Sequence, residues 1–441
     1  MDLSWYGGTH PYGYSVLAPA LMAVVGVRLC GLLAAVAGAV LLGRLLKDGD
    51  RPLLSAVAAG VFCVADVVSG RTTFALGAVA ALAALALLPR RRWAAVAAVL
   101  TGLLSPVAAA FLGLAALVLV LHRRPGGWSV GVATTVPVVA ANVLFPGRGV
   151  QPFSADLALP ALGVALVVAV MTSSPLVRTG ALLSGLVTAV LAMTDDPFGS
   201  NVVRLGLVVA LPVLLATTRR SGPVVLAVSL GLLAWQLDPT RDDVAASAGP
   251  PLKALVSELT SVQAQRVEVV AARDHRDAFE VARAVPLARG WSRQLDVAAN
   301  DLFYEGDLTP ERYVGWLHAH AVDHVAVPRH GALDFGSARE AGLLAKPVAG
   351  LVEVWSDRDW RVLSVTDPQP IADTTVVSSG RTRLVLRADH AGDVRVRVRW
   401  SRWLSLTGPG CLEEDGSEVR VRFTAPGTVT LGSGLRPRGH C

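Results

Sequence analysis

The sequence predicts an α-helical polytopic membrane domain of about ten transmembrane helices, followed by an extracytoplasmic α/β unit and a small β-sandwich. Apolar stretches recur through the first half of the 441-residue chain, which overall is 53% hydrophobic and 17% charged. An ordinary soluble domain is about 25% charged. Residues 1–237 hold 15 basic and 7 acidic side chains, whereas residues 238–441 hold 25 and 27. The net charge of +6 therefore arises in the apolar half, as is typical of a membrane domain with a soluble tail.

The membrane domain is expected over residues 1–237, because its apolar stretches approach the roughly 17–25 residues of a bilayer-spanning helix. The stretch 93–121 is short for two crossings and could form a broken helical hairpin around Ser105 and Pro106. The run 15–26 is too short to cross and is expected to lie at the membrane interface. The predicted helices cover 29–46, 52–69, 72–89, 93–104, 106–121, 128–146, 158–172, 179–194, 201–217 and 222–236.

Basic residues in the loops predict the orientation of these helices. When the helices are taken alternately, every basic cluster falls on one side, which the positive-inside rule makes cytoplasmic. The same alternation puts residues 1–28 and the tail outside the cytoplasm, so we expect a multi-pass protein of the cytoplasmic membrane. The clusters are Arg44 with Lys47 and Arg51, Arg90 to Arg92, Arg123 with Arg124, Arg178, and Arg219 with Arg220.

The N-terminus needs a separate explanation, because no upstream helix or signal peptide delivers residues 1–14 to the outer side. Either a short N-terminus is translocated, or a first helix precedes Met1 in a longer chain. We favour the second interpretation.

A small set of polar residues lies on the predicted outer side, where each needs a partner or a function because polar groups are costly in a bilayer. A lipid-linked phosphate, Asp66 or Asp195 would satisfy Arg204 through charge-assisted hydrogen bonds. An ion pair that orients two helices is the alternative. The loop 2–14, rich in aromatic residues, could handle a sugar headgroup or serve as an interfacial anchor. The outer set comprises Arg28, Asp66, Arg71, Asp195, Asp196, Asn201 and Arg204.

Five short segments carry a pattern shared with known membrane proteins. They are His10–Pro19, Gly70–Gly77 and Asp196–Gly206 in the membrane half, and Pro286–Asp296 and Thr309–Leu317 in the tail, the last followed by the strand-like Val322–Pro328. Together they resemble polytopic actinobacterial membrane proteins built like the C-type glycosyltransferase superfamily. The resemblance implies transfer of a hexose or pentose from a polyprenyl-phosphate donor to a cell-envelope glycan or lipid outside the cytoplasm.

The resemblance also implies roles for individual residues. A carboxylate in the first external loop of such enzymes acts as a base or orients the acceptor, often with a divalent cation such as Mg²⁺ or Mn²⁺. Asp2 is the only acid before the first full helix, so it is the expected catalytic residue, unless a preceding helix brings the true acid with it. The expected phosphate ligands are Arg28, Arg71 and Arg204, whose planar guanidinium groups suit phosphate. The expected substrate loop comprises His10, Tyr14, Asp195, Asp196 and Asn201.

The tail begins with a polar linker over 238–251, which precedes the α/β unit at 252–367 and the sandwich at 371–441. Thr309 as N-cap and Pro310 at the first position predict a helix that runs to about His320. Arginines alternate with valines in the sandwich strands, so we expect them to face solvent and not to bind nucleic acid. Strands are predicted at 266–271, 322–327, 351–355, 360–365, 381–387, 394–400, 419–423 and 428–431, a second helix at 337–344, and a short helix or strand at 277–284.

The cysteines and histidines carry weaker signals. Cys30 and Cys63 are expected to pack inside membrane helices, whereas Cys411 and Cys441 lie in the external tail, where oxidation is possible, and are predicted to form a disulfide. Helical spacing separates His318 from His320, and His324 falls in a strand, so we expect surface positions for all three and no metal site. The metal, if any, stays unidentified.

Two classes of function remain open. The chain contains no Walker loop, GxGxxG fingerprint, GxSxG elbow or CxxC pair, which removes support for nucleotide-driven transport and dinucleotide chemistry. The first class is a membrane glycosyltransferase or a degenerate member of that scaffold. The second is a non-catalytic scaffold or transporter whose external tail binds a partner. Few polar residues at mid-membrane depth argue against a secondary transporter.

Overall fold

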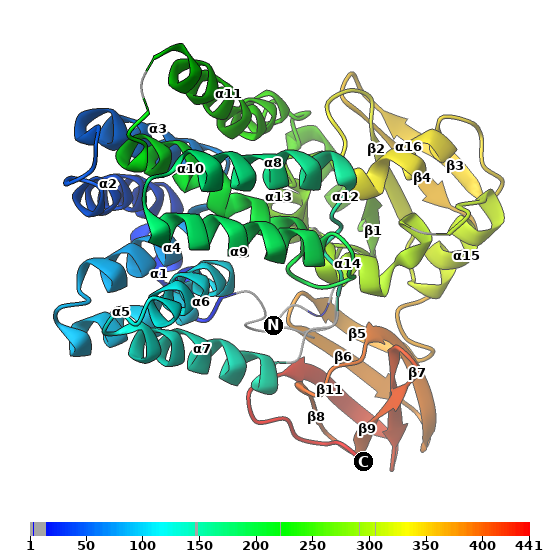
Figure 1. The fold of residues 1–441 in the computed structure, drawn as a ribbon. Helices are drawn as coiled ribbons and strands as arrows, with labels where there is room; N and C mark the ends of the chain where they lie inside the picture. The colour runs from blue at the N-terminus through cyan, green and yellow to red at the C-terminus, as the bar shows by residue number, and fades with distance from the viewer. Residues whose placement is uncertain (1–2, 4–14, 146–148, 221, 291, 305) are drawn as a thin grey trace. The chain divides into compact units, whose positions relative to one another are not determined.

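The computed structural model describes the whole chain except residues 1–2, 4–14, 146–148, 221, 291 and 305. It divides into a helical unit, Tyr12–Ala245, and a strand-rich unit that joins the N-terminal segment Met1–Pro11 to Ala246–Cys441. Figure 1 draws the helical unit in blue to green and the sheets of the second unit in green to red. A helical first half followed by a β-rich region confirms the coarse fold class expected from the sequence.

The helices of the first unit follow the predicted segments closely. The ten predicted helices correspond to α2–α11, with ends shifted by a few residues except at the C-terminus of α11, and the predicted interfacial run corresponds to α1. Proline opens α3, α6 and α9, where its missing N–H costs nothing. The helices are α1 (Ala18–Val25), α2 (Val27–Leu45), α3 (Pro52–Val68), α4 (Thr72–Ala86), α5 (Arg91–Leu104), α6 (Pro106–Leu121), α7 (Gly127–Leu144), α8 (Ala155–Met171), α9 (Pro175–Leu191), η2 (Gly199–Val202), α10 (Val203–Thr217) and α11 (Pro223–Ala246).

Several of these helices suit a membrane. Within the described residues, four segments are long and apolar enough to cross one: α2, α7, η2 together with α10, and α11. Shorter apolar helices are α3, α4, α6, α8 and α9. Leu33, Val36 and Val40 of α2 are each more than half exposed, although large apolar side chains on a soluble protein are mostly buried. The apolar exterior and the apolar helices indicate a membrane protein.

Small residues let the helices approach one another closely. Ala84, Ala98 and Ala116 are almost completely buried in one cluster that joins α4, α5, α6 and α7. Gly77 of α4 faces Ser105, and a Cβ on this glycine would lie 2.5 Å from the Ser105 Cβ. Any larger residue at position 77 would push the helices apart, which is the usual reason for glycine at helix contacts in membranes.

The basic loops gather at one end of the helical unit. The Arg51 guanidinium donates hydrogen bonds to the carbonyls of Thr218 and Arg220. Arg178 donates to the carbonyl of Thr172, beside the same loop. His122 lies 2.9 Å from the Thr179 hydroxyl. Since α3 starts at this end and α10 finishes there, their opposite ends form the other face of the unit.

Helix α11 corrects the predicted linker. The sequence predicts an irregular segment from residue 238, but the helix continues through Pro239 to Ala246. The extension is held by tertiary contacts, because the Thr240 hydroxyl lies 3.1 Å from the Ser69 hydroxyl and Asp243 pairs with Arg71. These contacts outweigh the loss of one backbone hydrogen bond at the proline.

The α/β part of the second unit has a four-stranded sheet in the order β1-β2-β4-β3. Strands β1 and β2 are parallel, and the other neighbours are antiparallel. Residue Leu287 also pairs with β1 in parallel, on the side away from β2. The elements are α12 (Lys253–Ser261), β1 (Val267–Val269), α13 (Asp277–Glu280), η3 (Val281–Arg283), α14 (Arg293–Ala299), η4 (Asp301–Phe303), α15 (Pro310–Ala319), β2 (His324–Pro328), η5 (Phe335–Ser337), α16 (Ala338–Leu344), β3 (Leu351–Ser356) and β4 (Trp360–Val365).

Alternating side chains bury both faces of this sheet. Val325 and Val327 of β2 pack with Leu317 of α15 in one cluster, whereas Ala326 packs with Leu255 of α12 in the other. Thr309 caps α15 by accepting a hydrogen bond from the Arg312 N–H, as predicted. The segment left open as helix or strand at 277–284 is helical.

The sandwich consists of a three-stranded sheet, β7-β10-β9, and a four-stranded sheet, β5-β6-β11-β8. Val396, Val419 and Leu431 are fully buried in their shared core, and Leu3 from the N-terminal segment joins them. A disulfide joins Cys411 to Cys441. The strands are β5 (Thr375–Gly380), β6 (Arg383–Ala388), β7 (Gly392–Arg399), β8 (Leu404–Thr407), β9 (Gly410–Asp415), β10 (Glu418–Phe423) and β11 (Gly427–Ser433).

Candidate functional site

The first candidate site lies at the end of α3 and the start of α4, away from the basic loops. Asp66 is in the last turn of α3, and Arg71 precedes α4. The Arg71 guanidinium lies 3.8 Å from an Asp66 oxygen and 3.3 Å from an Asp243 oxygen of α11. Asp66 is 5% exposed and Asp243 28%. The buried acid and the more accessible acid therefore share one arginine.

Arg204 joins this cluster from α10. Its guanidinium carbon lies 5.7 Å from the centre of the Phe74 ring, and its charge acts on both Asp66 and Arg71. The structure thus brings together two of the three arginines that the sequence selects as phosphate ligands. With Asp66 and Asp243, they make a group of two cations and two anions, which we call the arginine cluster.

The third selected arginine, Arg28, is exposed in the first turn of α2, and no contact in the described part of the chain links it to the arginine cluster. Asp2, His10 and Tyr14 lie outside the described residues. The predicted catalytic acid and two of the five predicted substrate-loop residues therefore fall in the part of the chain that the structure does not describe.

Asp196 and Asn201 shape their own loop. The Asp196 carboxylate accepts hydrogen bonds from the backbone N–H groups of Phe198 and Gly199, at 2.6 and 3.0 Å. The Asn201 amide donates to the Phe198 carbonyl. Gly199 has a φ of +40°, and a Cβ there would clash with the Gln151 carbonyl oxygen. These residues give the loop its fixed conformation, and Asp195 beside them is exposed.

Sequence reasoning missed the polar face of α11. Gln236, Thr240 and Asp243 are spaced i, i+4 and i+7, which places them on one side of a helix. The Gln236 amide donates to the carbonyls of Gly206 and Leu207 in α10, and the two other residues reach Ser69 and Arg71. This spacing was visible in the sequence, but the prediction of a linker from residue 238 concealed it.

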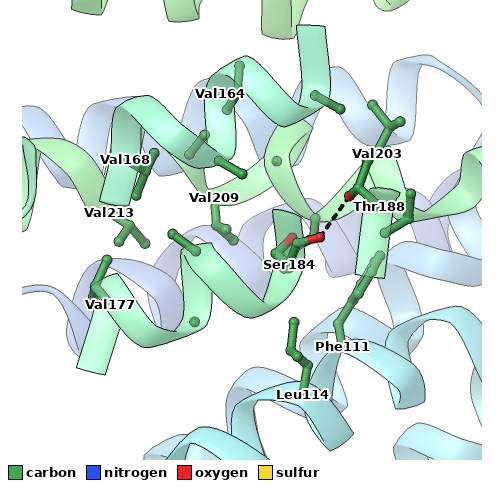
Figure 2. Close-up of a pocket in the computed structure, with 18 of the residues that line it drawn as sticks. Phe111, Leu114, Val164, Val168, Val177, Ser184, Thr188, Val203, Val209 and Val213 are labelled. Atoms are coloured by element: carbon green, nitrogen blue, oxygen red, sulfur yellow. Dashed lines mark hydrogen bonds between the residues drawn. The ribbon is translucent and has the colours of Figure 1, made fainter. Parts of the chain in front are cut away.

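An apolar cavity lies beside the arginine cluster, between α6, α8, α9, α10 and α11 (Figure 2). Its volume is about 210 Å³, compared with the roughly 150 Å³ that admits a benzene-sized ligand in other proteins. Phe111 and Val203 line it, and Val203 directly precedes Arg204. Phe111 also packs edge-to-face against Phe74, the ring under Arg204, with 6.0 Å between centroids. The cavity and the arginine cluster are therefore neighbours.

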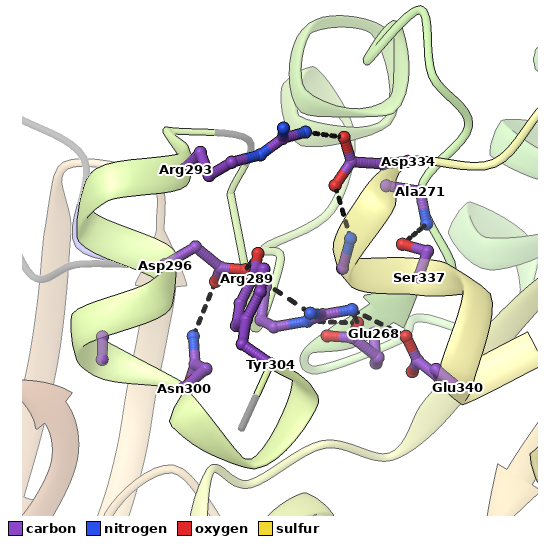
Figure 3. Close-up of polar contacts among 12 residues, drawn as sticks. Glu268, Ala271, Arg289, Arg293, Asp296, Asn300, Tyr304, Asp334, Ser337 and Glu340 are labelled. Carbon is purple, nitrogen blue, oxygen red and sulfur yellow. Dashed lines mark hydrogen bonds and ion pairs between the residues drawn. The ribbon is translucent and has the colours of Figure 1, made fainter. Parts of the chain in front are cut away.

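A second charged group lies inside the α/β part, where two of the recognised tail segments meet (Figure 3). Arg289 contacts Glu268 at 2.7 Å, Glu340 at 2.6 Å and Asp296 at 3.5 Å. The Tyr313 hydroxyl donates to Glu340. We call this group the buried network, because Glu268 and Glu340 are fully buried and Arg289 and Asp296 nearly so.

The buried network has one arginine against three carboxylates, and this imbalance is reflected in the pKa of its members. Burial and the adjacent Glu340 carboxylate raise the pKa of Glu268 well above its usual range. Burial raises the pKa of Glu340 as well. Burial alone would lower the pKa of Arg289, but the carboxylates of Glu268, Glu340 and Asp296 raise it. This closed group positions the sheet and helices and is too buried to act on a substrate.

Two of the three histidines are more buried than the surface positions expected for them. His318 does contact a backbone carbonyl at the surface. His320 is largely buried, with Nδ1 bonded to the Trp316 carbonyl and Nε2 2.9 Å from Arg399. His324 lies beside Asp323. Among the described residues, no three His, Cys, Asp or Glu side chains form a group that could hold a metal ion, so the divalent cation implied by the resemblance has no matching ligand set here.

The sandwich arginines do not all face solvent as expected: Arg397 is buried, where it pairs with Asp373 and donates to the Pro370 carbonyl, whereas Arg420 and Arg422 form ion pairs across their sheet. Arg420 contacts Asp415 and Asp393, and Arg422 contacts Asp393 and Glu413. These surface ion pairs neutralise part of the row of arginines that alternates with valines in the sandwich strands.

Comparison with known proteins adds no further constraint: no protein-family model and no curated protein matches this chain.

Proposed function

We propose that this chain is an integral membrane glycosyltransferase-like protein that transfers a sugar from a polyprenyl-phosphate donor to a cell-envelope glycan or lipid at the outer face of the cytoplasmic membrane. The observation that carries the proposal is the meeting of Arg71 and Arg204 at one end of the helical unit, beside an apolar cavity and opposite to the basic loops.

The proposed topology has α2–α11 crossing the membrane, with the basic loops in the cytoplasm. The shorter helices then require a locally thinned bilayer. The Leu3 N–H donates a hydrogen bond to the Arg381 carbonyl of the tail. Two residues in contact lie on the same side of a membrane, so this bond supports an even number of crossings between Leu3 and Arg381. The arginine cluster, at the other end of α3 and α10, then faces the outside.

The arginine cluster suits the phosphate of the donor. Guanidinium groups bind phosphate oxygens through paired, charge-assisted hydrogen bonds. A phosphate that takes the place of Asp243, the more exposed acid, would meet both Arg71 and Arg204 while Asp66 stays paired. The ion pairs thereby hold the arginines in position before the donor arrives.

The cavity suits the first part of a polyprenyl chain. Its lining is mostly aliphatic, and of its two hydroxyl-bearing residues, Ser184 and Thr188, the Thr188 hydroxyl donates to the Ser184 carbonyl. Burying hydrocarbon there contributes roughly 25 cal/mol per Å². Because Val203 lines the cavity and Arg204 is the next residue, a polyprenyl chain in the cavity would have its phosphate beside Arg204.

Transfer would proceed by attack of an acceptor hydroxyl on the anomeric carbon, with cleavage of the bond between that carbon and the phosphate oxygen. Arg71 and Arg204 would stabilise the charge that develops on the departing phosphate. The hydroxyl proton would pass to a carboxylate base, for which Asp2 stays the candidate. No step of this scheme depends on a metal ion.

The test uses full-length protein in lipid nanodiscs with labelled polyprenyl-phosphate sugars and envelope extract. We expect Arg71→Ala and Arg204→Ala each to reduce transfer at least 100-fold, about 2.7 kcal/mol. The matched control is Arg124→Ala, an exposed arginine of the basic loops, with transfer within twofold of the native rate. Transfer that survives both substitutions would overturn the site.

A non-catalytic scaffold or transporter is the second candidate, favoured by the large tail. Absence of transfer with every donor, together with retained binding of the lipid phosphate, would contradict the enzymatic proposal and support this alternative.

A further inference from the structure

The α/β part places chemically reactive groups at one edge of its sheet. The strands β1 and β2 and the segment at Leu287 run parallel, so their carboxyl ends meet at the same edge, where ligands bind in open α/β sheets. The loops after β1 and β2 are also tied together, because the Arg273 N–H donates to the Ala332 carbonyl and the Asp334 N–H to the Ala271 carbonyl. Each of the three segments is followed by polar residues.

An acid, an arginine and a histidine from these loops meet at the edge. Asp334, after β2, is paired with Arg293 of α14 and lies 3.2 Å from His275, after β1. Figure 3 shows the Arg293–Asp334 pair beside the buried network and separate from it. Arg293 is 29% and His275 20% exposed, so both reach solvent. Burial alone would raise the pKa of Asp334, but the hydrogen bond from His275 and the charge of Arg293 lower it.

An exposed aromatic surface adjoins this group. Phe335, which follows Asp334, is 63% exposed. Its ring stacks on Tyr304, with 6.3 Å between centroids, and the Arg293 guanidinium lies 5.7 Å from its centre. Nothing in the described part of the chain buries the outer face of the Phe335 ring, although an aromatic ring of this size gains considerably from burial.

A nearby carboxylate has an unused acceptor. Asp277 is 6% exposed, and its Oδ1 has no hydrogen-bond partner among the described residues. It lies within electrostatic reach of His275 and Arg289. A buried polar atom without a partner is costly, and a ligand hydroxyl would supply the missing donor.

We propose that this edge, formed by Phe335, Tyr304, Arg293, Asp334, His275 and Asp277, binds a neutral saccharide. The C–H face of a sugar ring packs on Phe335, and its hydroxyls donate to the carboxylates and accept from Arg293. The paired charges select a neutral ligand, because an anion would meet Asp334 and Asp277 and a cation would meet Arg293. This site does not depend on sugar transfer in the membrane unit.

The test is binding of neutral hexose and pentose oligosaccharides to the full-length protein in nanodiscs, measured by saturation-transfer NMR and calorimetry. We expect Phe335→Ala and Asp277→Asn each to raise the Kd about tenfold or more, equivalent to about 1.4 kcal/mol. Val352→Ala is the control, an exposed apolar residue on the far edge strand β3, with Kd within twofold. Thermal unfolding checks that the variants are folded.

Several outcomes would overturn the proposal: no binding by the native protein at millimolar sugar, equal binding by Phe335→Ala, or tighter binding of a uronic-acid oligosaccharide or an aromatic peptide than of any neutral sugar. The Arg71→Ala and Arg204→Ala variants separate the two proposals. They are expected to lose transfer but to bind the oligosaccharide as the native protein does.

Discussion

The two charged groups of this protein differ in how completely their charges are balanced. The arginine cluster has two cations and two anions, and one acid, Asp243, reaches solvent. The buried network has one arginine against three acids, with Glu268 and Glu340 fully enclosed. A balanced group near solvent can exchange one partner for a ligand, whereas an enclosed group can only be kept or broken. Exposure thus separates the proposed ligand site from a group that holds the fold.

The largest expected effect comes from removing the centre of the buried network. Arg289→Met leaves three buried carboxylates without their cation and should lower the free energy of unfolding of the tail by about 3–5 kcal/mol. Urea-dependent pulse proteolysis of the full-length protein in detergent measures it. Arg422→Ala, a partly exposed arginine of the sandwich, is the control and should change stability by less than about 0.5 kcal/mol. A similar loss in both variants would erase the distinction between enclosed and exposed pairs.

A smaller effect follows from His320, whose burial and proximity to Arg399 lower its pKa to about 3. The unfolded chain, with a histidine pKa of about 6.5, binds a proton first as the pH falls. Between pH 6.5 and 5 the native protein should therefore lose about 2 kcal/mol of stability that a His320→Gln variant keeps.

Parallel urea titrations at pH 7 and pH 5 measure this difference. Burial raises the pKa of Asp277 to about 6. The contribution of Asp277 to the free energy of unfolding therefore changes in the opposite direction: it falls as the pH rises from about 4 to 6. Comparison of the variant with the native protein cancels its contribution. An identical pH dependence in both proteins would show that His320 is protonated in the fold.

The smallest effect sharpens the description of the arginine cluster. Asp243→Asn removes the carboxylate that pairs with Arg71. If the proposed phosphate takes the place of this acid, we expect the affinity for a polyprenyl phosphate to rise about tenfold, or 1.4 kcal/mol. Asp242→Asn, at the exposed neighbouring position of α11, is the matched control and should have little effect. Weaker binding by Asp243→Asn would mean that Asp243 positions Arg71 for the ligand.

Much of this architecture was predictable because its signals are local. Apolar length located the helices of the first unit, and the Thr309-Pro310 pair located the start of α15. The predictions failed where a distant contact decided the local structure. Thr240 and Asp243 lie in a helix that is tied to Ser69 and Arg71 through their side chains, contacts that no local sequence pattern predicts.

Among the candidate site residues, too, local signals selected the residue types, and distant contacts decided which residues come together. Residue type and position on the predicted outer side selected Arg71 and Arg204, which the structure brings together, and also Arg28, which it leaves exposed and apart. Asp196 and Asn201 were selected as substrate residues, but their hydrogen bonds shape the loop. Side-chain type alone does not distinguish a group that binds a ligand from one that binds its own backbone.

By itself, the sequence determined the apolar helices, the separation of the basic loops from Arg71 and Arg204, and the alternating strands of the sandwich, since each depends on periodicity or composition along the chain. Only the tertiary structure decided which charges meet: Arg204 with Arg71 and Asp66, Arg289 with Glu268 and Glu340, and His275 with Asp334. The physical reason is that an ion pair acts over a few ångströms in space, and residues far apart in the chain reach that distance only when the helices and strands have packed.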